Sequence, residues 1–232
     1  SDHLPSVIVS AAVEPDGEMD ALVARVLVGL VDGDAEVRAG AARRLGEQAT
    51  PKTLPLVLRR ISDVDSRTMT AVVLAIKIIA RGSPEAVRDA LVGLVHAANP
   101  SDRRAAASII ARVRDATLAP ELVRALGDSD DRVVSAAHQA LSELTLQDFG
   151  TDALPWLRWW EKNASRHRVE WLIDALTHPV AEMRRAAGEE LRAVTREYFG
   201  YSSDLPVRER EHAQQRYRDW WATDGHLRFP TT

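Results

Sequence analysis

The chain has 232 residues, of which 45% are hydrophobic and 28% charged, and its formal net charge is -4 at pH 7. This composition is typical of a globular protein, and its mild acidity gives no overall attraction to nucleic acid or to an anionic membrane. The absence of cysteine excludes disulfides, thiolate catalysis and Cys-ligated metal sites. No apolar run reaches the roughly 18 to 20 residues that a membrane span requires.

Residues 1–18 are expected to form a flexible or docked leader, with a short helix or strand as the alternative. The apolar stretch is interrupted by Pro5 and ends at the turn-like residues 14–17. The segment lacks an initiator methionine and the charge pattern of a signal peptide, which indicates a processed chain or a fragment of a larger protein. Arginine supplies most of the cations, which favours a GC-rich bacterial genome. We expect a cytoplasmic location and leave a periplasmic one open.

One stretch, DAEVRAGAARRLG at residues 34–46, returns in approximate copies about every 30 residues along the chain. Its Val37, Ala41 and Leu45 share one helical face and are expected to bury against neighbouring helices. A wide apolar stripe over residues 19–31 predicts an outer helix before it, and Asp34 suits the N-cap of the inner helix. The aligned positions in the five copies are 37, 69, 103, 133 and 183.

The later copies predict four more helix pairs. Their ranges are 51–61 with 66–81, 84–97 with 102–115, 118–126 with 130–144, and 166–177 with 181–194. The interval between the last two aligned positions is about 20 residues longer than the others. The additional residues belong to a second repeated feature.

This feature, a Phe-Gly/Trp-Trp module, follows both the fourth and the fifth inner helix. A threonine precedes a Phe-Gly pair, then Leu-Pro, then a helix that ends in two tryptophans. The glycine is expected to be a left-handed helix C-cap, and the proline to start the next helix. We interpret the six tryptophans as closing and splinting the end of the repeat array, with an aromatic ligand cage as the alternative. The expected regions are 19–196 for the repeats, with 145–163 as an inserted module, and 197–232 for a capping helix and tail.

The pattern of Asp34, Val37-Arg38, Gly40-Ala41 and Leu45, with its copies, resembles HEAT repeats. The resemblance implies an all-α, right-handed solenoid of about five antiparallel helix pairs, with the tryptophan-rich segment as a C-terminal cap. It also implies that Arg38, Arg104 and Arg184, which follow the aligned positions, pair with an aspartate of an adjacent unit. The Phe-Gly/Trp-Trp module resembles the C-terminal part of bacterial HEAT-repeat proteins of unassigned function and implies no activity.

If the aligned positions face the interior, the opposite edge of each inner helix lines a concave face. That edge is apolar in the second and third copies and acidic toward the ends, as expected for a groove that binds a peptide or helix of another protein. The alternatives are that the leader fills the strip or that it is plain packing. The predicted partner-binding residues are Val72, Ala75, Ile79, Ala106, Ile109, Val113, Glu143 and Glu189.

The sequence predicts a non-catalytic scaffold without a metal or small-molecule cofactor. None of its seven histidines is followed by glutamate, as the resemblance to the iron-dependent deoxyhypusine hydroxylases would require, and no phosphate loop or nucleophile elbow is present. The alternative function is nucleic-acid binding, as in the HEAT-like alkylpurine DNA glycosylases. The predicted concave face has more carboxylates than arginines, which argues against nucleic acid as a partner. A role in chromophore attachment rests on fold analogy alone.

Overall fold

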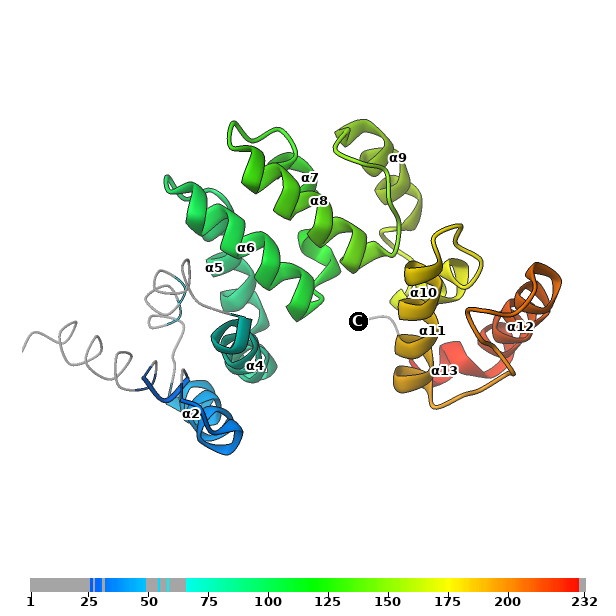
Figure 1. Cartoon of the computed structure of the whole chain (residues 1–232), viewed down its shortest axis with the longest axis horizontal. Helices are drawn as coiled ribbons and strands as arrows, with labels where there is room; N and C mark the ends of the chain where they lie inside the picture. The colour runs from blue at the N-terminus through cyan, green and yellow to red at the C-terminus, as the bar shows by residue number, and fades with distance from the viewer. Residues whose placement is uncertain are drawn as a thin grey trace, which may run out of the picture. The chain divides into compact units, whose positions relative to one another are not determined.

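A computed structural model gives the arrangement of residues 26, 28–30, 32–48, 54, 58 and 66–229 (Figure 1). All regular elements in this part of the chain are helical, which agrees with the predicted fold class. The predicted leader and most of the first two outer helices lie outside the described residues. The chain divides into two compact units, residues 1–94 and 95–232, which are described separately below.

The described helices of the first unit are α2 (Ala35–Gln48), α4 (Ser66–Gly82) and α5 (Pro84–Val95). Helices α2 and α4 are inner helices of successive copies and pack against each other. Asp34 accepts a hydrogen bond from the backbone N–H of Glu36 at 2.7 Å, so the predicted N-cap is confirmed.

The second unit begins with α6 (Pro100–Val113), the 3₁₀ turn η1 (Ala116–Leu118), α7 (Ala119–Ala125) and α8 (Asp131–Thr145). Asparagine and aspartate side chains cap α6 and α8, because each accepts the backbone N–H two residues later. Inner helix α8 packs against both the preceding inner helix α6 and its own outer helix α7.

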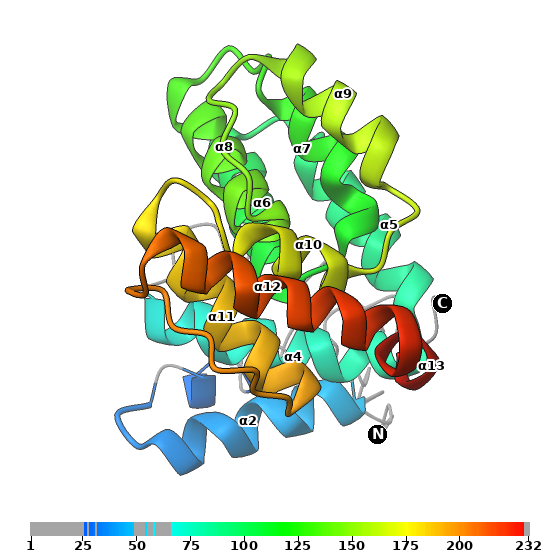
Figure 2. The same ribbon diagram turned by 90° about the vertical axis from the view of Figure 1, so that its right-hand side faces the viewer.

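The rest of the second unit contains α9 (Ala153–Asn163), α10 (Arg168–Ala175), α11 (Ala181–Thr195) and α12 (Val207–Trp220). Helices α10 and α11 form the last predicted pair, α9 packs against α7, and α12 packs against α10 (Figure 2). The chain continues through a π-helical turn, η2 (Trp221–Gly225), into the short α13 (His226–Arg228). The order of helices in this unit therefore follows the prediction.

The two Phe-Gly/Trp-Trp modules begin with the same local structure. Thr145 and Thr195 are buried at the ends of α8 and α11. Each hydroxyl donates to the carbonyl four residues earlier, at 2.7 Å, and accepts the backbone N–H two residues later, at 3.2 Å. The prediction that glycine caps these helices is wrong, because the left-handed caps are Leu146 and Arg196. The glycines Gly150 and Gly200 instead take positive φ in the turns that follow.

The tryptophans of the first module lie within packed structure. Trp156 is buried, donates its indole N–H to the carbonyl of Gly150 at 2.8 Å and meets the Phe149 ring edge-on at 4.9 Å between centroids. Trp171 of α10 is also buried and lies between Trp159 and Trp160, at 5.1 and 6.0 Å between centroids. These contacts join α9 to α10 and favour the splinting interpretation over a ligand cage.

The second module packs on a hydrophobic core shared by α10, α11 and α12. Tyr201, in the loop before α12, is buried there and donates its hydroxyl to the carbonyl of Leu176 at 2.7 Å. Its ring lies against α11 at Gly188, where an added Cβ would come within 2.7 Å of the ring. The absence of a side chain at Gly188 thus lets the loop approach the helix closely.

Candidate partner-binding surface

The arginine of the repeat occupies the fourth position of its inner helix and makes the same contacts each time. In α2, α6 and α11 this residue is Arg38, Arg103 and Arg184. Each donates from Nη1 to the two carbonyls that lie six and five residues earlier, at 2.7 to 3.0 Å. The side chain therefore ties the turn between the two helices of a pair to the start of the inner helix.

The predicted pairing with an aspartate of the next unit occurs at Arg103. Its guanidinium binds Asp128 in the turn before α8 through two hydrogen bonds of 2.7 and 2.9 Å. This bidentate pair lowers the pKa of the Asp128 carboxyl. The prediction that Arg104 has this role is wrong, since Arg104 is exposed.

The fourth helical position also corrects the alignment of the copies. The aligned residues Val37 and Met183 are the third residues of α2 and α11. Met69 and Arg103 are instead the fourth residues of α4 and α6, so the predicted alignment of the second and third copies is one residue too late. A shift of one residue turns a helical side chain by about 100°. In these two copies the predicted concave edge therefore falls on the packed side of the helix.

Five of the predicted partner-binding residues consequently belong to the core. Their side chains are buried, so the apolar strip predicted over α4 and α6 is not exposed; of the three interpretations, packing and cover by the leader remain, and the leader lies outside the described residues. These residues are Val72, Ala75, Ile79, Ala106 and Ile109. In the first copy Ala41 is buried as predicted, but Val37 is 41% exposed.

The remaining predicted residues lie at or near the surface. Val113 is partly buried, whereas Glu143 on α8 and Glu189 on α11 are exposed, as the alignment of the fourth and fifth copies predicts. On α8 Glu143 accepts a hydrogen bond from Gln139, at 2.9 Å. We call the exposed stripe of α11 the α11 face; it consists of Glu182, Arg185, Ala186, Glu189, Arg192 and Ala193.

An ion cluster holds α11 in place within the second unit. Glu190, on the partly buried side of α11, accepts hydrogen bonds from Arg168 of α10 at 2.7 and 3.0 Å. It also pairs with Arg114 at the end of α6, at 2.6 Å. Arg168 donates in addition to the carbonyl of Leu144 at the end of α8. Three helices are thereby tied to the helix that carries the exposed stripe.

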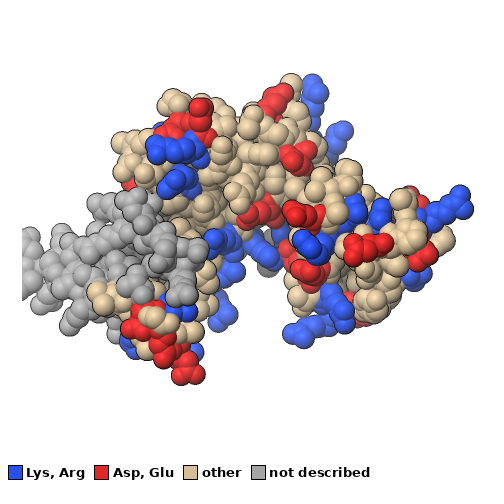
Figure 3. All heavy atoms as spheres, in the orientation of Figure 1, with Lys and Arg blue, Asp and Glu red and all other residues tan. Residues whose placement is uncertain are grey.

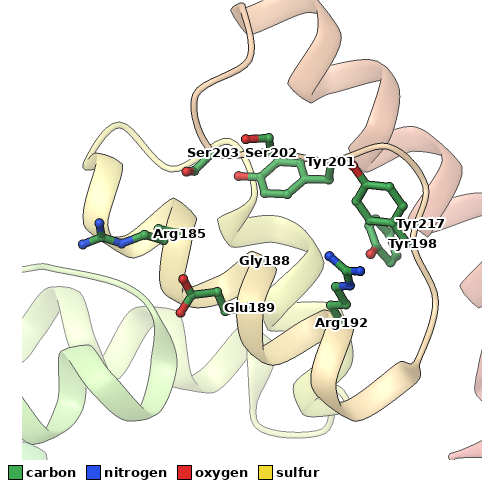
Figure 4. Close-up of a pocket in the computed structure, with 9 residues that line it drawn as sticks. All are labelled: Arg185, Gly188, Glu189, Arg192, Tyr198, Tyr201, Ser202, Ser203 and Tyr217. Atoms are coloured by element: carbon green, nitrogen blue, oxygen red, sulfur yellow. The ribbon is translucent and has the colours of Figure 1, made fainter.

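A pocket of about 370 Å³ opens beside the α11 face (Figure 4). On its floor the ring of Tyr201 covers Gly188, and at one side the guanidinium of Arg192 lies over the ring of Tyr198, 4.8 Å from its centroid. Sequence reasoning did not identify this pocket, because its loop residues lie outside the repeat pattern. It is lined by Arg185, Gly188, Glu189, Arg192, Tyr198, Tyr201, Ser202, Ser203 and Tyr217.

Two of the tyrosines that line the pocket are held by hydrogen bonds to the backbone. Burial raises the pKa of both Tyr201 and Tyr217, so these phenols stay protonated at neutral pH. Each donates to a backbone carbonyl, of Leu176 and Glu197 respectively. Among the described residues no group of three or more His, Cys, Asp or Glu side chains could hold a metal ion. No helix in the same part of the chain has the length and hydropathy of a membrane span.

Charges of both signs are mixed over the described surface. Figure 3 shows lysine and arginine side chains interspersed with aspartate and glutamate over the second unit. On the α11 face, Glu182 and Glu189 alternate with Arg185 and Arg192. Phosphate-backbone binding requires clustered cations, and on this face the cations alternate with carboxylates.

Helices α7 and α8, and then α10 and α11, form successive pairs, and the inner helices α2, α6 and α11 repeat one arginine-centred turn, as in a helical repeat protein. Residues 20–96 and 87–168 match the family model for HEAT repeats, and together they cover more than half of the chain. The chain belongs to the HEAT-repeat family. The match ends before α11, so it does not include the second module.

Solved structures similar to the chain include two crystal structures of engineered proteins from the Northeast Structural Genomics Consortium. One is 20% identical, with 90% of each chain covered and a TM-score of 0.27. The other is 22% identical, with 87% of this chain and 91% of that chain covered and a TM-score of 0.27. No curated protein matches the chain.

Proposed function

We propose that this protein is a non-catalytic scaffold that binds a segment of another protein through the exposed edges of inner helices α8 and α11. The observation that carries the proposal is the α11 face, a stripe of exposed charged and small side chains on a helix whose other side is anchored in the core. Helical repeat proteins commonly recognise partners along such successive helix edges. Glu143 and Glu189 remain from the predicted set as contact residues, while the buried apolar residues are assigned to packing.

The burial of Val72 and Ile109 determines which experiment is informative. A charge introduced at either position would be buried without a partner and would destabilise the chain, so loss of binding there would report unfolding. The contact residues must therefore be probed from the exposed edge.

A photo-crosslinking amino acid placed at position 143 or 189 tests the proposal directly. In a lysate of the source cells we expect each position to give a discrete crosslinked protein band. Glu161, which is exposed on α9, is the matched control position and should not give this band. Absence of crosslinks at both 143 and 189, or the same bands from all three positions, would contradict the proposed function.

A further inference from the structure

The α8 and α11 copies can be compared residue by residue. Thr145 and Thr195 have the same contacts, as described above, and are 50 residues apart. The left-handed cap residues Leu146 and Arg196, and the positive-φ glycines that follow them, keep the same separation. Each position on α8 thus corresponds to the position 50 residues later on α11.

The flank of α8 next to the loop that follows this helix leads toward the next helix pair. His138, on this flank, contacts Asp148 of the loop at 2.7 Å. The Asp148 carboxylate in turn interacts electrostatically with His178, which lies in the turn just before α11. This flank of an inner helix is therefore the side that faces the following pair.

The corresponding flank of α11 carries the pocket. Gly188 stands at the place of His138, and Tyr198 at the place of Asp148. The structure describes only a single residue beyond α13, and no further helix pair among the described residues lies on this flank. The pocket is thus the surface on which a repeat of this kind would receive its next neighbour.

The side chains around the pocket indicate the chemistry of an occupant. Arg185 and Arg192 are exposed, on opposite sides of Gly188 and Tyr201 in Figure 4, with Glu189 as the single acidic residue of the lining. The Nη2 atom of Arg185 is as far as 4.0 Å from the Oε1 atom of Glu182, and both side chains are largely exposed, so this ion pair is weak. Tyr198 is 57% exposed, and its ring offers apolar area beside the Arg192 guanidinium that lies over it.

We propose that the pocket on α11 binds an acidic segment of a partner protein, with carboxylates at Arg185 and Arg192 and an apolar side chain against Tyr198. This inference rests on the proposed scaffold function and assigns the chemistry of the partner. The excess of cations over carboxylates in the lining favours an acidic segment over a basic one. The exposed ring selects a segment with at least one apolar residue.

The test is selection from a random peptide display library on the immobilised full chain. We expect enrichment of peptides that combine aspartate or glutamate with a large apolar residue. The double variant R185E/R192E should bind the selected acidic peptides at least about tenfold more weakly and should itself select basic peptides, since the charge of the site is reversed. The variant R104E/R112E, which reverses two exposed arginines of α6, is the matched control and should keep the acidic preference.

Three outcomes would overturn the inference: no enriched acidic class, equal binding of the acidic peptides by R185E/R192E and the native chain, or a labelled DNA oligonucleotide that competes for the same site. Circular dichroism and the urea midpoint check that the variants remain folded. If positions 143 and 189 give crosslinks but the selected peptides bind R185E/R192E as tightly as the native chain, the scaffold function stands and the assignment of the pocket is refuted. Loss of the crosslinks would refute the scaffold function itself.

Discussion

At the scale of single residues, the pocket depends on the lack of a side chain at Gly188. The Tyr201 ring that covers this glycine is held at its other end by the hydrogen bond to Leu176. The ring therefore cannot move away without breaking a buried contact. Tyr201 is thus positioned by its packing on Gly188 and by its hydrogen bond to Leu176, and it determines how close the loop comes to α11.

We predict that Gly188→Ala destabilises the second unit. The new Cβ would lie 2.7 and 2.9 Å from two ring carbons of Tyr201. Overpacking of this kind costs about 1–3 kcal/mol, and the better helix propensity of alanine offsets up to about 1 kcal/mol. Urea denaturation followed by circular dichroism, which reports on helices of both units, measures the difference.

Gly93→Ala in α5 is the control for this substitution, because a Cβ at Gly93 would meet nothing within 4 Å. Alanine there should leave stability unchanged or increase it by up to about 1 kcal/mol. A Gly188→Ala chain at least as stable as the native chain would show that Tyr201 is free to shift.

The N-cap of α8 gives a prediction on pH. The pKa of Asp130 is lowered to about 2, first by the side-chain hydrogen bond from Arg132 and then by the backbone N–H of the same residue. Because this pKa is lower in the folded chain than in the unfolded chain, the contribution of the carboxylate is complete above about pH 4. It is lost as the pH falls from about 4 to about 2.

Asp130→Asn removes this titration but keeps an equally good capping side chain. The difference in urea midpoint between the native chain and Asp130→Asn should be constant near neutral pH and should shrink toward zero below about pH 4. A difference that stays constant down to about pH 2 would mean that the carboxylate is not coupled to folding.

At the scale of elements, the fourth residue of each inner helix determines the register of the repeat. The order of the helices and the capping role of Asp34 could be predicted from the sequence, because periodicity and cap residues are local signals. The register of α6 could not, since Arg103 and Arg104 are adjacent and either fits the pattern. Only the contact with Asp128, which is distant in sequence, distinguishes them. The α11 pocket has no local signal either, because Tyr198 and Tyr201 reach α11 from an irregular loop.

This assignment predicts different outcomes for two neighbouring substitutions. Arg103→Ala should clearly lower the urea midpoint, because it removes two bonds to Asp128 and two to the turn carbonyls of Ala97 and Ala98. Arg103→Lys should lie in between, since lysine keeps the charge but cannot make the bidentate contact.

Arg104→Ala is the matched control for the Arg103 variants and should change the midpoint little, as is usual for an exposed position. Equal effects of Arg103→Ala and Arg104→Ala would contradict the register given by the fourth helical position.

At the scale of the whole molecule, the two compact units contain different spectroscopic probes. All six tryptophans lie between residues 156 and 221, so fluorescence reports only on the second unit, whereas circular dichroism reports on helices of both. Each repeat contacts mainly its neighbours, so a helical repeat chain can lose its units one after another. The aromatic and ionic contacts described for α9 to α12 stabilise the second unit, which is therefore expected to unfold last.

We accordingly predict that circular dichroism begins to change at a lower urea concentration than tryptophan fluorescence. Thr195→Val separates the two signals further. It removes a buried hydroxyl that makes two backbone hydrogen bonds at the end of α11, a loss of about 1–3 kcal/mol. It should therefore shift the fluorescence transition while leaving the early part of the dichroism curve in place. Thr223→Val, at an exposed threonine, is the control and should shift neither. Coincident transitions in the native chain, which move together in Thr195→Val, would instead show that all the repeats unfold as one cooperative unit.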